Sequence, residues 1–189
     1  STTDMKVTFS ASDSLDDTKA AKLRTVTKVE LATDVSLTIE SDAFDNSTDE
    51  WSDLSTITGQ SSGTNNLVIS NGFGTDAATI DLYGISTLTN IDAVTIADTT
   101  AADVINLSAG LTESGVVTVN LSSSDADMDK IYFGVNESSF TSSNTLEYVT
   151  VNNFEVGKDR IGLYYYGFSG DSGQIASAVG GTNKRTGVA

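Results

Sequence analysis

Cysteine and proline are both missing from the 189 residues of this chain. Without cysteine, no disulfide can stabilise the fold, although disulfides are the usual support of a secreted protein with a thin core. Such a protein must rely instead on bound cations, stacked repeats or association with neighbours. Without proline, the turns depend on the 16 glycines and on Asn, Asp and Ser, whose side chains hydrogen-bond to the turn backbone.

Histidine is absent as well. Its absence removes the commonest general base, the Ser–His and Cys–His nucleophile systems, and most zinc sites. A pair of carboxylates could still support glycosidase chemistry, but no two acidic residues have a spacing that singles them out. We therefore expect that the chain is not an enzyme.

Basic residues are few, because 10 Lys and Arg stand against 26 Asp and Glu, for a formal net charge of −16. Nucleic acids and anionic membrane surfaces bind clustered Lys and Arg, so neither is an expected partner. The sequence has no apolar run of about 18 residues, so we expect no insertion into a membrane. Two interpretations of the acidity stay open: it keeps a Ser- and Thr-rich surface soluble, or it supplies carboxylates to Ca²⁺.

A two-part repeat begins near residue 67. Its first part is an apolar-Thr-apolar strand, found at 94–96, 117–119 and 149–151. Its second part has the form Asp-x-Ile-x-(Leu/Phe), found at 103–107, 129–133 and 159–163. A degenerate earlier copy comprises 67–69, Asp76 and 80–82. One such unit cannot bury its Val, Ile and Leu side chains alone, whereas stacked units can.

The repeat predicts an all-β protein, a parallel β-solenoid or β-roll-like stack with a short N-terminal helix. A β-sandwich whose hairpins resemble one another in composition is the alternative. The helix is expected at 14–24, where Ser14 and Asp17 have the spacing of a capping box and Lys22 and Arg24 fall in the last turn.

Composition divides the chain into three parts. Residues 1–66 are expected to form an N-terminal cap that ends in a polar loop, linker or arm from 41 onward. Residues 67–168 form the repeat domain, and residues 169–189 form a C-terminal tail. Trp51 is the only large anchor of the polar segment, and its ring either docks on the parent domain, which we favour, or offers a platform for carbohydrate.

Several aspartates are candidate ligands for Ca²⁺, a cation that takes about 6–8 oxygen ligands. One lies in 71–79, a degraded Gly-Gly-x-Gly-x-Asp nonapeptide, and three alternate along 125–129. Others open the second strand of the repeat. The 125–129 segment is no EF-hand, because Lys130 and Asn136 stand where that loop has glycine and glutamate. The full candidate set is Asp76, Asp103, Asp125, Asp127, Asp129 and Asp159.

The stretch 148–163 resembles a segment near the C-terminus of RTX-type proteins exported by type I secretion. That pattern reads loosely Val/Ile-x-x-Phe-x-x-Gly-x-Asp-x-Ile-x-Leu, and its places are filled here by Val151, Phe154, Gly157, Asp159, Ile161 and Leu163. Phrases at 91–98 and 102–108 are similar to phrases in bacterial surface-layer proteins of this export class. The resemblance covers roughly 67–168. It implies a Ca²⁺-associated β-roll or β-helix, export without an N-terminal signal peptide, and a place on the cell surface.

These observations lead to the expectation of a structural extracellular protein, S-layer-like or otherwise self-assembling, that is stabilised by Ca²⁺ and associates with its own copies. The alternative is an adhesin or other β module that binds a cell-surface glycan. Its contacts would be Trp51 and the run Tyr164, Tyr165 and Tyr166 with Phe168, although those rings can equally close one end of the β-stack.

Overall fold

The computed structural model describes residues 5–44, 51, 53–70, 76–112, 114–122, 127–135 and 149–163. Its strands form three sheets. Sheet A contains, in spatial order, β1 (Lys6–Phe9), β3 (Lys28–Leu31), β5 (Thr56–Thr58) and β8 (Thr87–Thr89). Sheet B contains β13 (Thr150–Asn152), β11 (Val117–Asn120), β9 (Ala93–Ala97), β6 (Asn66–Ser70), β4 (Ser36–Glu40) and β2 (Asp13–Leu15). Sheet C contains β14 (Arg160–Leu163), β12 (Lys130–Val135), β10 (Val104–Ser108) and β7 (Thr79–Leu82).

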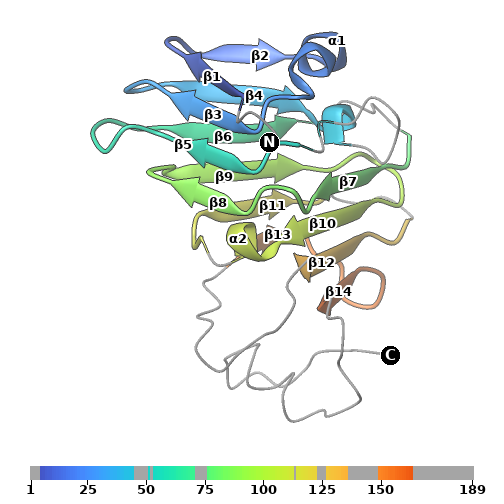
Figure 1. Cartoon of the computed structure of the whole chain (residues 1–189). Helices are drawn as coiled ribbons and strands as arrows, with labels where there is room; N and C mark the ends of the chain where they lie inside the picture. The colour runs from blue at the N-terminus through green and yellow to red at the C-terminus, as the bar shows by residue number, and fades with distance from the viewer. Residues whose placement is uncertain are drawn as a thin grey trace.

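All strand pairs among these residues are parallel. Consecutive strands belong to different sheets, so the chain returns to the same sheet one turn later, as Figure 1 shows. This winding is a β-solenoid, which confirms the predicted fold. The β-sandwich alternative is wrong, because sandwich sheets are antiparallel.

The faces of the solenoid change along its length. In the first turns, the place beside sheets A and B is taken by the helical segments α1 (Asp17–Ala20), η1 (Ala21–Leu23) and η2 (Ser41–Phe44). The strands of sheet C take that place from β7 onward, and η2 contacts β7. On the other side, α2 (Ala109–Thr112) follows β8 in the column of sheet A (Figure 1). A short helical turn thus replaces a strand at either end of the stack.

The predicted repeat stacks in register. Val94 pairs with Val117, and Thr118 pairs with Thr150, so the first strands align residue for residue. Ile105 of the second strand pairs with Ile131, and Ile131 pairs with Ile161 in the next turn. Inward-facing residues such as Val94 and Ile105 are fully buried. Each buried Val, Leu or Ile contributes about 1.5–3 kcal/mol to stability, which is how a core of small aliphatic side chains holds the stack.

The N-terminal helix is present but shorter than expected. Ser14 lies in β2, so the predicted capping box of Ser14 and Asp17 is wrong. Asp16 caps the helix instead, because its Oδ1 accepts a hydrogen bond of 2.8 Å from the Lys19 amide. The local reason is that Leu15 is buried in the first turn of the core, which keeps its neighbour Ser14 extended.

The polar segment from residue 41 onward takes part in the stack. Trp51 is 1% exposed, lies parallel to the Phe44 ring at 6.4 Å, and donates from Nε1 to the Val26 carbonyl at 2.9 Å. Strand β5 pairs with β3 and β8, while β6 joins β4 to β9 across the compositional boundary at 66 and 67. The docked ring confirms the favoured interpretation of Trp51, and its burial leaves no platform for carbohydrate.

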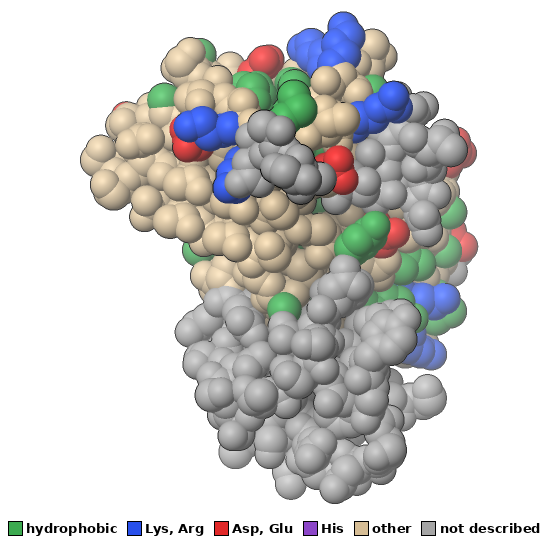
Figure 2. All heavy atoms as spheres, in the orientation of Figure 1, with side chains coloured by type: hydrophobic (Ala, Val, Ile, Leu, Met, Phe, Trp, Pro, Cys, Tyr) green, Lys and Arg blue, Asp and Glu red, His purple; other side chains and the backbone are tan. Residues whose placement is uncertain are grey.

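On the face seen in Figure 2, most of the described surface carries no charged side chain. Figure 2 shows charged side chains scattered over the first turns and along the side of sheet C, with uncharged atoms covering most of the side of sheet A. No helix in the described part of the chain is long and apolar enough to cross a membrane.

Candidate metal centre

A ladder of aspartates runs along the corner that joins sheet B to sheet C. Asp103, Asp129 and Asp159 each precede a strand of sheet C, and the register of those strands places them one above another, with Ala78 in the equivalent place before β7. Each carboxylate binds the backbone amide of the residue one turn before it. Ala78 N donates to Asp103 Oδ1 at 2.7 Å, Asp103 N to Asp129 Oδ1 at 2.9 Å, and Asp129 N to Asp159 Oδ1 at 3.2 Å.

The second carboxylate oxygens of two ladder aspartates accept hydrogen bonds from backbone amides of the same turn. Asp103 Oδ2 accepts the amide of Thr99 at 2.6 Å, and Asp159 Oδ2 accepts the amide of Glu155 at 2.7 Å. All three ladder aspartates are 4% exposed or less. Hydrogen bonds to a buried carboxylate are about twice as strong as neutral ones, so all three aspartates fix the turn before them, and Asp103 and Asp159 also fix their own corner.

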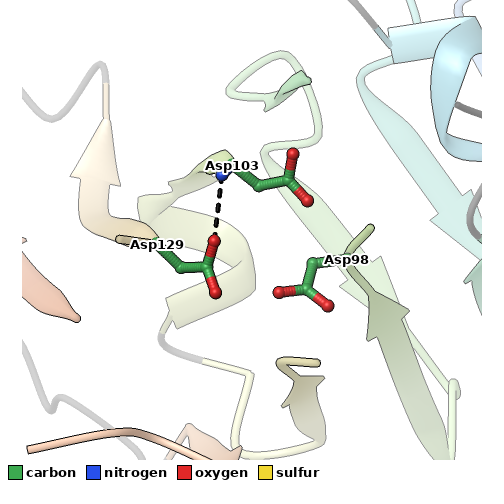
Figure 3. Close-up of side chains that lie close together, drawn as sticks. All are labelled: Asp98, Asp103 and Asp129. Atoms are coloured by element: carbon green, nitrogen blue, oxygen red, sulfur yellow. Dashed lines mark hydrogen bonds between the residues drawn. The ribbon is translucent and has the colours of Figure 1, made fainter. Parts of the chain in front are cut away.

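Asp98 turns this ladder into a cluster. It follows directly after β9, in the same corner, and Figure 3 shows its carboxyl group facing those of Asp103 and Asp129. One carboxylate oxygen from each of the three side chains lies within 4.8 Å of the others. The three residues come from the end of β9 and the starts of β10 and β12, so two turns of the solenoid contribute to one site.

The Asp98 carboxyl group is poorly solvated. It is 6% exposed, and no donor among the described residues reaches its Oδ2. Burial raises the pKa of Asp98 to about 8, aided by the negative charges of Asp129 and Asp103 and by a hydrogen bond with Asp129. The backbone amide of Ser122 opposes this pKa shift only in part. Without a cation, Asp98 therefore holds a proton at neutral pH, because its carboxyl group is buried beside two other carboxyl groups.

The six predicted ligands fall into different places. Asp103 and Asp129 belong to the cluster, and Asp159 belongs to the ladder one turn beyond it. Asp76 and Asp127 are exposed at the surface, and Asp125 lies outside the described residues, as do Tyr164, Tyr165, Tyr166 and Phe168. The register explains the position of Asp76, because Ala78, two residues later, occupies the ladder place.

Sequence reasoning missed Asp98. The residues that follow β11 and β13 at the same level are Leu121 and Asn153, so Asp98 is not part of any repeat. The available signal was its position directly after an apolar strand, five residues before the repeated Asp103.

An ionised carboxylate only accepts hydrogen bonds, so the cluster can hold a hard cation or a proton shared between two carboxyl groups. Comparison of the chain with protein-family models, curated protein sequences and solved structures gave no match.

Proposed function

We propose that this chain is a structural module of an extracellular surface assembly, S-layer-like in kind, and that it builds that assembly by associating with its own copies. The solenoid supports this role, because its turns are joined by continuous sheets and by a buried ladder of aspartates. The strongly acidic, cysteine-free composition and the resemblance of 148–163 to surface-exported proteins support the location.

The observation that carries the proposal is the outer face of sheet B. Its central row crosses all six strands without a charged residue, at the spacing of about 4.8 Å that separates neighbouring strands. The row consists of Ser14, Thr38, Val68, Thr95, Thr118 and Thr150. All six side chains are half-exposed or exposed. Beside the row, at the level where β4 carries Glu40, the side-chain amides of Asn120 and Asn152 are joined by a hydrogen bond of 2.8 Å.

Charge makes this face the place where two copies can approach. The chain has a net charge of −16, so two copies repel each other where their acidic side chains are exposed. A neutral row, in which every side chain but Val68 carries a hydroxyl group, reduces that repulsion and offers both donors and acceptors to an identical row on a second copy. We therefore assign the self-association surface to the face of sheet B.

The β2 end of sheet B is, by contrast, closed to strand pairing. The Ser14 amide donates to Asp13 Oδ1 at 2.8 Å, and the Ser14 carbonyl accepts from Lys19 Nζ at 2.7 Å. These side chains occupy backbone groups that a further strand would need. This arrangement disfavours extension of sheet B past β2 and is consistent with the proposed association through a side face.

Sedimentation velocity of the whole chain over a range of concentrations tests the proposal. The wild type should form dimers and larger species as concentration rises. Thr118→Arg places a charge at the centre of the row and should keep the chain monomeric, whereas Thr87→Arg on sheet A, an exposed strand position of the same residue type, should leave association unchanged. A wild type that stays monomeric at every concentration contradicts self-association, and equal effects of the two variants contradict the choice of face.

A further inference from the structure

We propose that Asp98, Asp103 and Asp129 form a divalent-cation site, suited to Ca²⁺, that joins two successive turns of the solenoid at the corner between sheets B and C. The inference concerns an ion bound within one copy of the chain. It does not depend on which outer face two copies use to associate.

The separation of the oxygens fits a single ion. Ca²⁺ holds its oxygen ligands at about 2.3–2.6 Å, so two oxygens on opposite sides of one ion lie roughly 4.8 Å apart and neighbouring ones lie closer. One oxygen from each of the three aspartates lies within 4.8 Å of the other two. The donor set consists of carboxylate oxygens, which are the ligands that a hard cation prefers.

Two of the ligands are already oriented by the backbone. Asp103 is held by the amides of Ala78 and Thr99, and Asp129 is held through its Oδ1 by the Asp103 amide (Figure 3). A carboxylate has about four lone-pair sites, so these bonds fix the orientation of each group without exhausting its capacity as a ligand. A cation would meet a preformed site, which lowers the entropic cost of binding.

The placement of Asp98 indicates that this corner binds an ion in addition to linking the turns. Its carboxyl group bonds the Ser122 amide of the following turn, whereas each ladder aspartate bonds an amide of the preceding turn, yet it is turned toward Asp103 and Asp129 (Figure 3). Its Oδ2 is buried without a donor among the described residues, in a side chain that is 6% exposed. A buried polar atom without a partner costs stability, and a bound cation would supply that partner.

This geometry determines which variants test the site and which serve as controls. Asp159 has the ladder bonds but lies outside the three-residue cluster, and Asp127 is exposed nearby in sequence. Asp98→Asn keeps the shape of the side chain and cannot ionise, so it never adds a negative charge to the buried cluster. It should therefore fold at least as well as the wild type in cation-free buffer, which separates loss of binding from loss of folding.

Isothermal titration of the chelator-treated whole chain with CaCl₂ at pH 7.5, paired with thermal melts, tests the site. The wild type should bind Ca²⁺ and melt at a higher temperature with it. Asp98→Asn should bind at least about tenfold more weakly and lose the thermal shift, because one charged ligand is gone. Asp127→Asn should match the wild type.

Two results would overturn the site. The first is a wild type that shows neither binding heat nor a thermal shift with Ca²⁺, which would mean that the cluster holds only a proton. The second is equal Ca²⁺ binding by the wild type and Asp98→Asn, which would place the ion elsewhere on the acidic chain. Because sedimentation in chelator reports self-association separately, failure of this site leaves the proposed function standing, and the reverse also holds.

Discussion

The backbone amide of Asp103 donates a hydrogen bond of 2.9 Å to Oδ1 of Asp129, one turn further along the solenoid. The same bond recurs between Asp129 and Asp159 at 3.2 Å. A side chain therefore links consecutive turns at a corner, between the ends of the parallel sheets. This relationship explains why the repeat keeps an aspartate at the start of its second strand.

Loss of the ladder bond at Asp129 should destabilise the fold. Asp129→Ala removes the acceptor for the Asp103 amide and leaves that amide buried without a partner, which costs about 1–3 kcal/mol in the free energy of unfolding. Urea denaturation followed by circular dichroism measures the change. Asp127→Ala at the exposed position should change stability by no more than about 0.5 kcal/mol. Equal losses from both variants would show that the ladder has no special role.

The pH dependence of stability should reflect Asp98. Its pKa is raised in the folded state from 3.8 to about 8, so the folded chain binds a proton that the unfolded chain has released. In cation-free buffer this contribution is fully present below pH about 4, declines above it, and is lost as pH passes through about 8.

Denaturation midpoints in chelator from pH 4 to 9 measure the effect, with Asp98→Asn as the matched variant. The asparagine does not titrate, so the difference in stability between the variant and the wild type should grow in favour of the variant as pH rises. Parallel curves for the two proteins would show that Asp98 ionises in the folded chain as it does in the unfolded one.

Trp51 should be a stabilising core residue. Trp51→Ala removes a ring that is 1% exposed and stacked on Phe44, so we expect a loss of about 3–5 kcal/mol. Trp51→Phe keeps much of the apolar contact but loses the bond to the Val26 carbonyl, and it should cost less. Because Trp51 is the single tryptophan, its fluorescence maximum in the wild type should lie at the short wavelengths of a buried indole. An emission maximum typical of a solvated indole would contradict this placement.

The β2 edge of sheet B should pair with strands of other copies when the side chains that bond its backbone are removed. Lys19→Met takes away the donor to the Ser14 carbonyl, and Asp13→Ala takes away the acceptor for the Ser14 amide. In a Thr118→Arg background, which blocks association through the face, the two changes together should produce β-rich aggregates detectable by light scattering. Lys22→Met is the control. No increase in scattering over that control would show that other groups protect this edge.

Most of the stack could be predicted from sequence because parallel stacking repeats the same residue types at the same places. Val94 and Val117 align as their spacing suggested, and so do Ile105 and Ile131. The first turns escaped the pattern because helical segments, rather than an Asp-x-Ile strand, occupy their third face. In those turns the polar composition of 41–66 concealed β5 and the buried Trp51.

The candidate site was only half predictable for the same reason. Asp103 and Asp129 belong to the repeat, so their alignment could be predicted. Asp98 occurs once, and only the folded corner shows that it lies beside them. Asp76 is the opposite case, a predicted ligand that lies outside the ladder. It precedes the ladder position at Ala78 by two residues, and a degenerate repeat does not fix the alignment that closely.

Electron microscopy of the concentrated whole chain is the most direct test of the central claim that this protein builds a surface assembly. Negatively stained samples of the wild type should contain ordered sheets or regular filaments of repeating particles, and Thr118→Arg should contain only separate particles. Fields of dispersed single particles from the wild type, at every concentration and with or without Ca²⁺, would contradict the claim.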